Sequence, residues 1–135
     1  MNKLAGLRND KYFNKIFLIT TLASFLFFIL AVTRHYLLQS NAYDLGLFDQ
    51  WIWLTSKNIP SYSTMTGLHM FADHGAWTLF IASVIYKLIP DINILFFTQS
   101  LSLCFTTIPL WLLCKKNNLS SKISFLMTIF WLLQP

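Results

Sequence analysis

Charged side chains are scarce in this chain, and carboxylates are the scarcest of them. Only 11% of the 135 residues are charged, and five residues are acidic. A soluble domain carries about 25% charged residues, so this balance indicates that lipid is the main solvent of the chain. Nucleic acid is excluded as a partner, because no soluble basic face with base-stacking aromatic residues is available.

Cysteine is rarer still, with only Cys104 and Cys114 in the chain. Both fall in the same apolar run, where ten helical residues separate them by about 15 Å. A disulfide needs Cα atoms within about 7 Å. The two thiols cannot pair within one helix, and we interpret them as neutral groups packed among apolar neighbours.

Long runs without charge are abundant instead. Residues 16–32 and residues 92–114 contain no charged side chain, and about 20 apolar residues suffice to cross a bilayer core. The fold class predicted is therefore all-α, a polytopic transmembrane helical protein. We expect spans at about 16–33, 74–89 and 92–114, and a partial span at about 120–135. Pro109 is expected to kink the third of them.

The first loop, residues 34–72, has an organisation of its own. Leu45, Phe48 and Ile52 recur at helical spacing, whereas the opposite side of the same segment carries Asp49, Trp53, Ser56 and Lys57. This pattern predicts an interfacial amphipathic helix over residues 45–57. Residues 58–68 contain proline, glycine and several hydroxyl residues, which indicates an exposed loop.

Basic residues flank the runs on both ends of the chain: Lys3, Arg8, Lys11 and Lys15 before the first, and Lys115, Lys116 and Lys122 after the third. Anionic lipid headgroups are their expected partners. The first cluster predicts an uncleaved anchor in the plasma (bacterial inner) membrane with a cytoplasmic N-terminus. Three crossings would then place the second cluster outside, against the positive-inside rule. Either residues 74–89 do not cross or the first cluster dominates, and we favour the second interpretation.

The segment YDLGLFDQ, residues 43–50, with Trp53 three residues later, resembles the signature of the family of predicted membrane proteins called domain of unknown function 2079. The similarity runs from about residue 34 to residue 135 and includes His74, Tyr86, Pro90, Gln99 and the pair Pro109-Leu110. One departure is that Gly75-Ala76-Trp77 follows the histidine, where the family often has Phe-Ser-Pro. Family members are several times longer, so we expect the chain to be an N-terminal fragment that stops within a fourth helix and is inactive as an enzyme on its own.

This family is in turn similar to the type C glycosyltransferases, which move a sugar from a polyprenyl-phosphate carrier to an acceptor on the outer face. Their first outer loop carries an acidic motif near the start of an interfacial helix. The resemblance implies a polyprenyl-phosphate sugar donor, inversion at the sugar carbon, and Asp44 as base or metal ligand. Such chemistry needs a base for the acceptor hydroxyl and a cation for the departing phosphate.

Each candidate residue also has a structural interpretation. Asp44 precedes the expected helix, where aspartate is a preferred N-cap. Asp49 is the second catalytic candidate, although a solvated residue on the polar face is the interpretation that we favour for it, and within one helix it would lie about 140° from Asp44. Arg34 and Lys57, the candidate phosphate contacts, also suit snorkelling to the interface.

His74 is the remaining substrate-binding candidate, because histidine binds phosphate or metal and shuttles protons. Asp73 beside it suits a cap of the next helix. His69 and His74 are five residues apart and lack a carboxylate cluster with metal-ligand spacing, so no tightly bound zinc is expected. The requirement for a divalent metal stays open. A different class of function also stays open, namely a non-catalytic membrane transport or assembly subunit in which the acidic loop is a binding or structural element.

Overall fold

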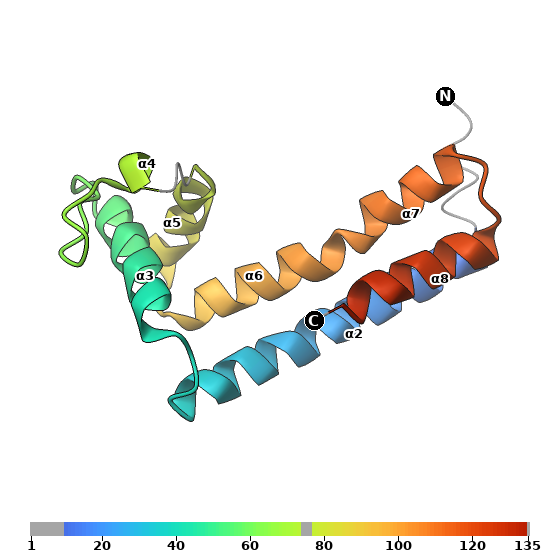
Figure 1. Cartoon of the computed structure of the whole chain (residues 1–135), viewed down its shortest axis with the longest axis horizontal. Helices are drawn as coiled ribbons and strands as arrows, with labels where there is room; N and C mark the ends of the chain where they lie inside the picture. Colours follow the sequence, from blue (N-terminus) through green and yellow to red (C-terminus); the bar gives the residue numbers. More distant parts are fainter. Residues whose placement is uncertain (1–9, 74–76, 135) are drawn as a thin grey trace. The chain divides into compact units, whose positions relative to one another are not determined.

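The computed structural model describes residues 10–73 and 77–134, and its regular structure in these ranges is helical (Figure 1). Extended backbone there is limited to one antiparallel bridge between Tyr62 and His69. The predicted all-α class is confirmed. The helices are α2 (Lys11–Tyr36), α3 (Ala42–Ser56), α4 (Met70–Asp73), α5 (Thr78–Leu88), α6 (Asn93–Phe105), α7 (Thr107–Lys116) and α8 (Ser121–Leu132).

Two stretches of helix are long and apolar enough to cross a membrane. Helix α2 has 26 residues and a mean hydropathy of 2.5, and the run Asn93–Lys116 that joins α6 to α7 has 24 residues and a mean hydropathy of 1.4. At 1.5 Å per residue they measure about 39 and 36 Å, against a bilayer core of about 30 Å. They coincide with the runs expected at 16–33 and 92–114.

The other apolar helices are shorter. Helix α5 has 11 residues and helix α8 has 12. Helix α5 is therefore about 16 Å long, roughly half of the hydrocarbon thickness. It lies in the segment expected to cross at 74–89, of which residues 74–76 fall outside the described part of the chain. On length, the described residues support two crossings.

The kink expected at Pro109 takes the form of an interruption between α6 and α7. Helix α6 ends at Phe105, whose carbonyl would pair with the backbone N–H that Pro109 lacks, and Thr106 separates the two helices. The Thr106 hydroxyl donates to the carbonyl oxygen of Leu103 at 2.5 Å.

The chain divides into two compact units, residues 1–29 with 99–135 and residues 30–98. In the first unit, Ile16 and Trp111 are buried, but many of the other buried positions are small and polar, and many of the exposed positions are large and apolar. Thr20 and Thr107 are fully buried and share a hydrogen bond between their hydroxyl oxygens at 2.7 Å. The buried small residues include Ser24, Ser124 and Thr128, whereas the exposed ones include Phe17, Leu18, Leu22, Phe25 and Leu26. This distribution is typical of helices that pack against each other in lipid.

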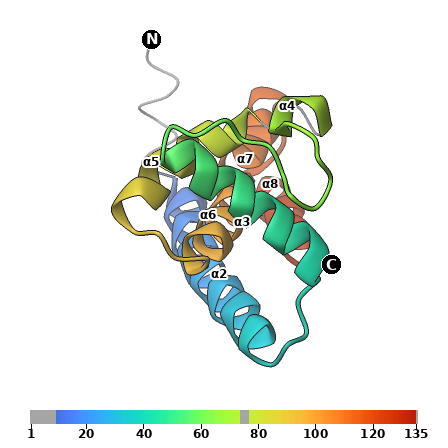
Figure 2. The ribbon, with the colours of Figure 1, turned by 90° about the vertical axis from the view of Figure 1, so that its left-hand side faces the viewer.

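The second unit contains α3, α4 and α5, and helix α3 packs on α5 (Figure 2). Its centre is formed by Leu47, Trp51 and Met70, with partly buried apolar neighbours at Phe48, Phe71 and Leu79. The expected loop is confirmed: residues 57–69 contain no helix, and Asn58 and Gly67 adopt positive φ angles of 57° and 70°.

The burial pattern of α3 includes Leu47, Trp51 and Ile52, and it departs from the predicted polar side at Ser56. Ser56, expected on the polar side, is buried with 4% of its surface exposed. Its hydroxyl donates to the carbonyl oxygen of Trp53 at 2.7 Å, so the helix itself satisfies the buried group. The two cysteines are buried and free, as expected.

Candidate functional site

The start of helix α3 is fixed by Asn41, not by Asp44. Asn41 has extended backbone angles, and its side-chain oxygen accepts a hydrogen bond from the backbone N–H of Tyr43 at 3.3 Å. The helix therefore begins at Ala42, three residues earlier than predicted. Asp44 is its third residue, so the interpretation of Asp44 as the N-cap is wrong.

Asp44 instead lies in the first turn of α3. The side-chain Nδ2 atom of Asn41 donates to Asp44 Oδ2 at 2.7 Å, and the Asp44 side chain is exposed. A carboxylate in the first turn interacts favourably with the positive end of the helix dipole, which typically contributes about 0.3–1 kcal/mol. Because Asp44 does not cap the helix, its carboxylate is oriented by the Asn41 side chain and is exposed to a ligand from solvent.

Asp49 has a different environment, because its carboxylate accepts a hydrogen bond that links α3 to α5. The hydroxyl of Tyr86 donates to Asp49 Oδ1, and Tyr86 is buried with 4% of its surface exposed. Burial raises the pKa of Tyr86, and the hydrogen bond and charge of Asp49, with the charge of Asp91, raise it further above its ordinary value. The tyrosine therefore stays protonated and donates. Asp49 is partly buried and has a protein partner on α5, so it is not a purely solvated residue of the polar face.

Gln50, the last residue of the YDLGLFDQ segment, holds the loop. Its amide nitrogen donates to the hydroxyl of Thr64 at 2.9 Å, and its amide oxygen accepts from the backbone N–H of Thr64 at 3.0 Å. The two bonds use both ends of the amide and fix the loop on α3. This residue was not identified from the sequence as a structural one, since a partner 14 residues away leaves no periodic signal.

The two aspartates do not converge. Both belong to α3, five residues apart, so their directions differ by about 140° around the helix axis. Asp49 also has its hydroxyl partner on α5. The structure therefore separates an exposed carboxylate, Asp44, from a partly buried one that is bonded to Tyr86, Asp49.

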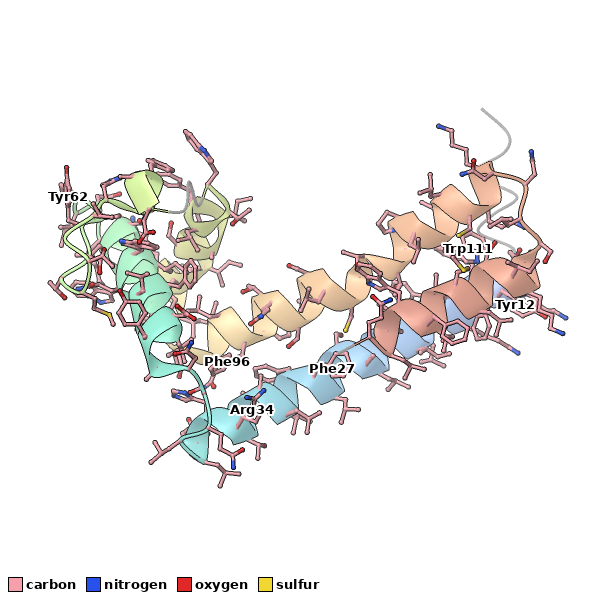
Figure 3. All side chains as sticks on the ribbon, in the orientation of Figure 1. Tyr12, Phe27, Arg34, Tyr62, Phe96 and Trp111 are labelled. Atoms are coloured by element: carbon pink, nitrogen blue, oxygen red, sulfur yellow. The ribbon has the colours of Figure 1, made fainter. Side chains whose placement is uncertain are left out.

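The candidate cations are also dispersed. Arg34 is exposed in the last turn of α2 and donates from Nη2 to the carbonyl oxygen of Gln39 at 3.3 Å (Figure 3). Lys57 is exposed directly after α3, about 20 Å along the helix from Asp44. His74 lies outside the described residues. Of these three residues, only Arg34 precedes α3 in the chain, and Asp44 lies in the first turn of that helix.

His69 is engaged in the loop. Its Nδ1 atom accepts from the backbone N–H of Phe71 at 3.4 Å, and its ring contacts those of Tyr62 and Phe71 at centroid distances of 5.2 and 5.3 Å. Within residues 10–73 and 77–134, no group of three or more histidine, cysteine or acidic side chains is placed to hold a metal ion. The expectation about zinc stays a prediction.

The exposed apolar helices, the small polar residues between them and the two lengths that match a bilayer together define a helical protein of membranes. A family model described as a predicted membrane protein, domain of unknown function 2079, matches residues 34–135. The chain belongs to this family. No curated protein and no solved structure matches it. The matched region contains the whole of α3, the loop and both ends of the Asp49–Tyr86 pair.

Proposed function

We propose that this chain is part of a polytopic glycosyltransferase of the type C kind, which transfers a sugar from a polyprenyl-phosphate carrier to a hydroxyl acceptor. In this proposal Asp44 is the general base or the ligand of a divalent metal. The single observation that carries it is the exposed carboxylate of Asp44 in the first turn of α3, eight residues after the end of α2.

The position of Asp44 suits a lipid-borne donor. The phosphate of a polyprenyl carrier lies at the headgroup level, and α2 is long enough to end there. Five residues connect the end of α2 to the start of α3, which keeps Asp44 close to that level. A base must come within hydrogen-bond reach of the acceptor hydroxyl, and an exposed carboxylate with one orienting neighbour meets this need.

The remaining candidates take different parts in the proposal. Arg34, exposed at the end of α2, would stabilise the negative charge on the departing phosphate. Lys57 is too distant along α3 to reach the same phosphate, and we assign it to lipid headgroups. His74 remains a phosphate or metal contact proposed from the sequence. Asp49 is a positioning residue, which holds α3 on α5 through Tyr86.

The experiment is a transfer assay of the full-length protein that contains this chain, in proteoliposomes with radiolabelled undecaprenyl-phosphate sugars, with the wild type and the Asp44→Asn variant. Asparagine retains an oxygen for the Asn41 amide but is not a base. We expect kcat to fall about 10²- to 10⁴-fold. The matched control is Asp91→Asn, which removes the same charge from an exposed aspartate in the loop before α6 and should stay within two-fold of wild type. An active Asp44→Asn protein would refute the catalytic role.

A non-catalytic transport or assembly role is the second candidate, and one observation favours it. Asp49 and Gln50 are both used to hold the unit 30–98 together. The YDLGLFDQ segment is thus in part a structural element. If the wild-type protein transfers none of the sugars while Asp49→Asn and Gln50→Ala abolish assembly, this second function is favoured.

A further inference from the structure

The basic clusters that flank the two long spans are remote in sequence but meet in the unit formed by residues 1–29 and 99–135. The ammonium group of Lys115 donates to the hydroxyl of Ser121 at 2.8 Å, and that hydroxyl donates to Asp10 Oδ2 at 2.7 Å. The start of α2, the end of α7 and the start of α8 are thereby joined at one end of this unit.

Two aromatic residues of this end, Tyr12 and Trp111, have lysine ammonium groups close to their rings (Figure 3). The ammonium groups of Lys11 and Lys15 lie 5.5 and 5.9 Å from the centroid of the Tyr12 ring, and that of Lys115 lies 5.9 Å from the ring of Trp111. The Tyr12 ring in turn contacts Phe125 at 5.5 Å. Tyrosine and tryptophan beside lysine are typical of the headgroup level of a membrane.

This arrangement bears on the topology. Helix α2 carries the chain across, and the run Asn93–Lys116 carries it back, if residues 37–92 stay on one side. Helix α5 lies in that segment and is about 16 Å long, too short to cross. Two crossings return the second basic cluster to the side of the first, as the contacts around Ser121 require. The conflict with the positive-inside rule, which three crossings created, then disappears.

The charge at this end is strongly positive among the described residues. The described residues of this unit include five lysines (Lys11, Lys15, Lys115, Lys116 and Lys122) and a single aspartate, Asp10, which is already bonded to Ser121 and to the backbone N–H of Tyr12. Four of the lysines are exposed, and Lys115 is partly buried. Five cations with one internally bonded anion leave an excess of positive charge for an external anion.

We infer that the two long spans form a hairpin whose basic ends share the cytoplasmic side, and that the five lysines there bind the phosphate of an anionic phospholipid. The aromatic rings would lie against the glycerol and upper acyl region, while the lysines reach the phosphate. This inference does not depend on the proposed glycosyl transfer, and the two can fail separately.

The topology is tested by thiol labelling of the intact chain, with Cys104 and Cys114 replaced by alanine. Single cysteines are introduced as Ala42→Cys, Leu88→Cys and Lys116→Cys, all at exposed positions. In intact cells we expect a membrane-impermeant maleimide to label positions 42 and 88 but not position 116. Protection of position 88 with labelling of position 116 would establish three crossings and overturn the hairpin. Labelling of position 116 alone would reverse the assigned side.

The lipid site is tested in nanodiscs of phosphatidylcholine with and without phosphatidylglycerol, by native mass spectrometry of retained lipid. The variant Lys11→Gln/Lys116→Gln should weaken retention of phosphatidylglycerol about five-fold for each charge removed. The charge-matched comparison is between single substitutions: Lys11→Gln should weaken retention about five-fold, whereas Lys87→Gln, at an exposed lysine of residues 30–98, should leave it within two-fold. Equal losses in the two single variants would overturn the site. So would displacement of the lipid by millimolar inorganic phosphate, since this would show a site for the free ion.

Discussion

Replacement of Tyr86 by phenylalanine tests the link between α3 and α5 directly. The substitution keeps the buried ring and removes only the hydroxyl that donates to Asp49. A hydrogen bond to a charged group contributes about 1.5–3 kcal/mol. Asp49 is only partly buried, and water can replace part of the lost interaction, so we expect a loss in the lower half of this range.

The assay is amide hydrogen exchange of the intact chain in nanodiscs. A loss of about 1.5–2 kcal/mol in the local opening free energy speeds exchange in α3 and α5 by about 10- to 30-fold. Exchange in α7 and α8 should not change, because these helices belong to the other compact unit. The matched control is Tyr62→Phe, which removes the hydroxyl of an exposed tyrosine in the loop.

The same link should depend on pH in a defined direction. The pKa of Tyr86 is raised in the folded protein, so its contribution to stability is complete below the ordinary tyrosine pKa of about 10 and declines as the pH rises beyond it. Protection of α3 and α5 that decreased between pH 7 and pH 9 in the wild type, or equal exchange in Tyr86→Phe and Tyr62→Phe, would refute this account of the Asp49–Tyr86 pair.

Three further outcomes are expected. Gln50→Ala removes both bonds to Thr64, each contributing about 0.5–1.5 kcal/mol, and should speed proteolysis within residues 57–69 at least three-fold, whereas no change would show that the loop is held elsewhere. Thr20→Val leaves the buried Thr107 hydroxyl without its partner and should destabilise the helix contact by about 0.6–1.7 kcal/mol in a detergent-unfolding titration. The double variant Thr20→Val/Thr107→Val buries no unpaired hydroxyl at this contact and should recover part of the lost stability. Burial raises the pKa of Asp10, but hydrogen bonds from Ser121 and Tyr12 and the charges of Lys115 and Lys11 lower it more. The Asp10 contact therefore stabilises the unit above about pH 4, and this stabilisation declines as the pH falls below that value. Asp10→Asn should abolish this pH dependence in the same titration.

The features set by composition and length could be predicted from the sequence. An uncharged run of at least 17 residues has few folded states other than a membrane helix, so α2 and the run through α6 and α7 were expected at nearly their observed places. The break before Pro109 followed from the missing N–H of proline. The irregular loop followed from its proline, glycine and hydroxyl residues.

The start of α3 could not be settled from local signals. Asn41 and Asp44 are both good N-caps, and either choice places the following apolar residues at helical spacing. The structure selects Asn41 and uses Asp44 in the first turn. The burial of Ser56 was missed for a related reason, because a serine whose hydroxyl bonds within its own helix needs no polar surroundings.

The pairings between distant residues left no trace in the sequence pattern. Asp49 and Tyr86 are 37 residues apart, and their contact depends on how α5 returns against α3. The buried hydroxyls of Thr20 and Thr107 lie 87 residues apart inside runs that only indicated lipid. The number of crossings was also ambiguous, since a run of about 15 apolar residues at 75–89 allows either a short span or the 11-residue helix observed.

The most direct test of the central claim is a single-turnover measurement with the donor already bound. Rapid mixing of acceptor with protein preloaded with a radiolabelled undecaprenyl-phosphate sugar separates the chemical step from donor binding. We predict that Asp44→Asn slows this step at least 100-fold while donor Kd changes less than three-fold. An unchanged single-turnover rate constant in Asp44→Asn would contradict the claim that this exposed carboxylate takes part in the reaction.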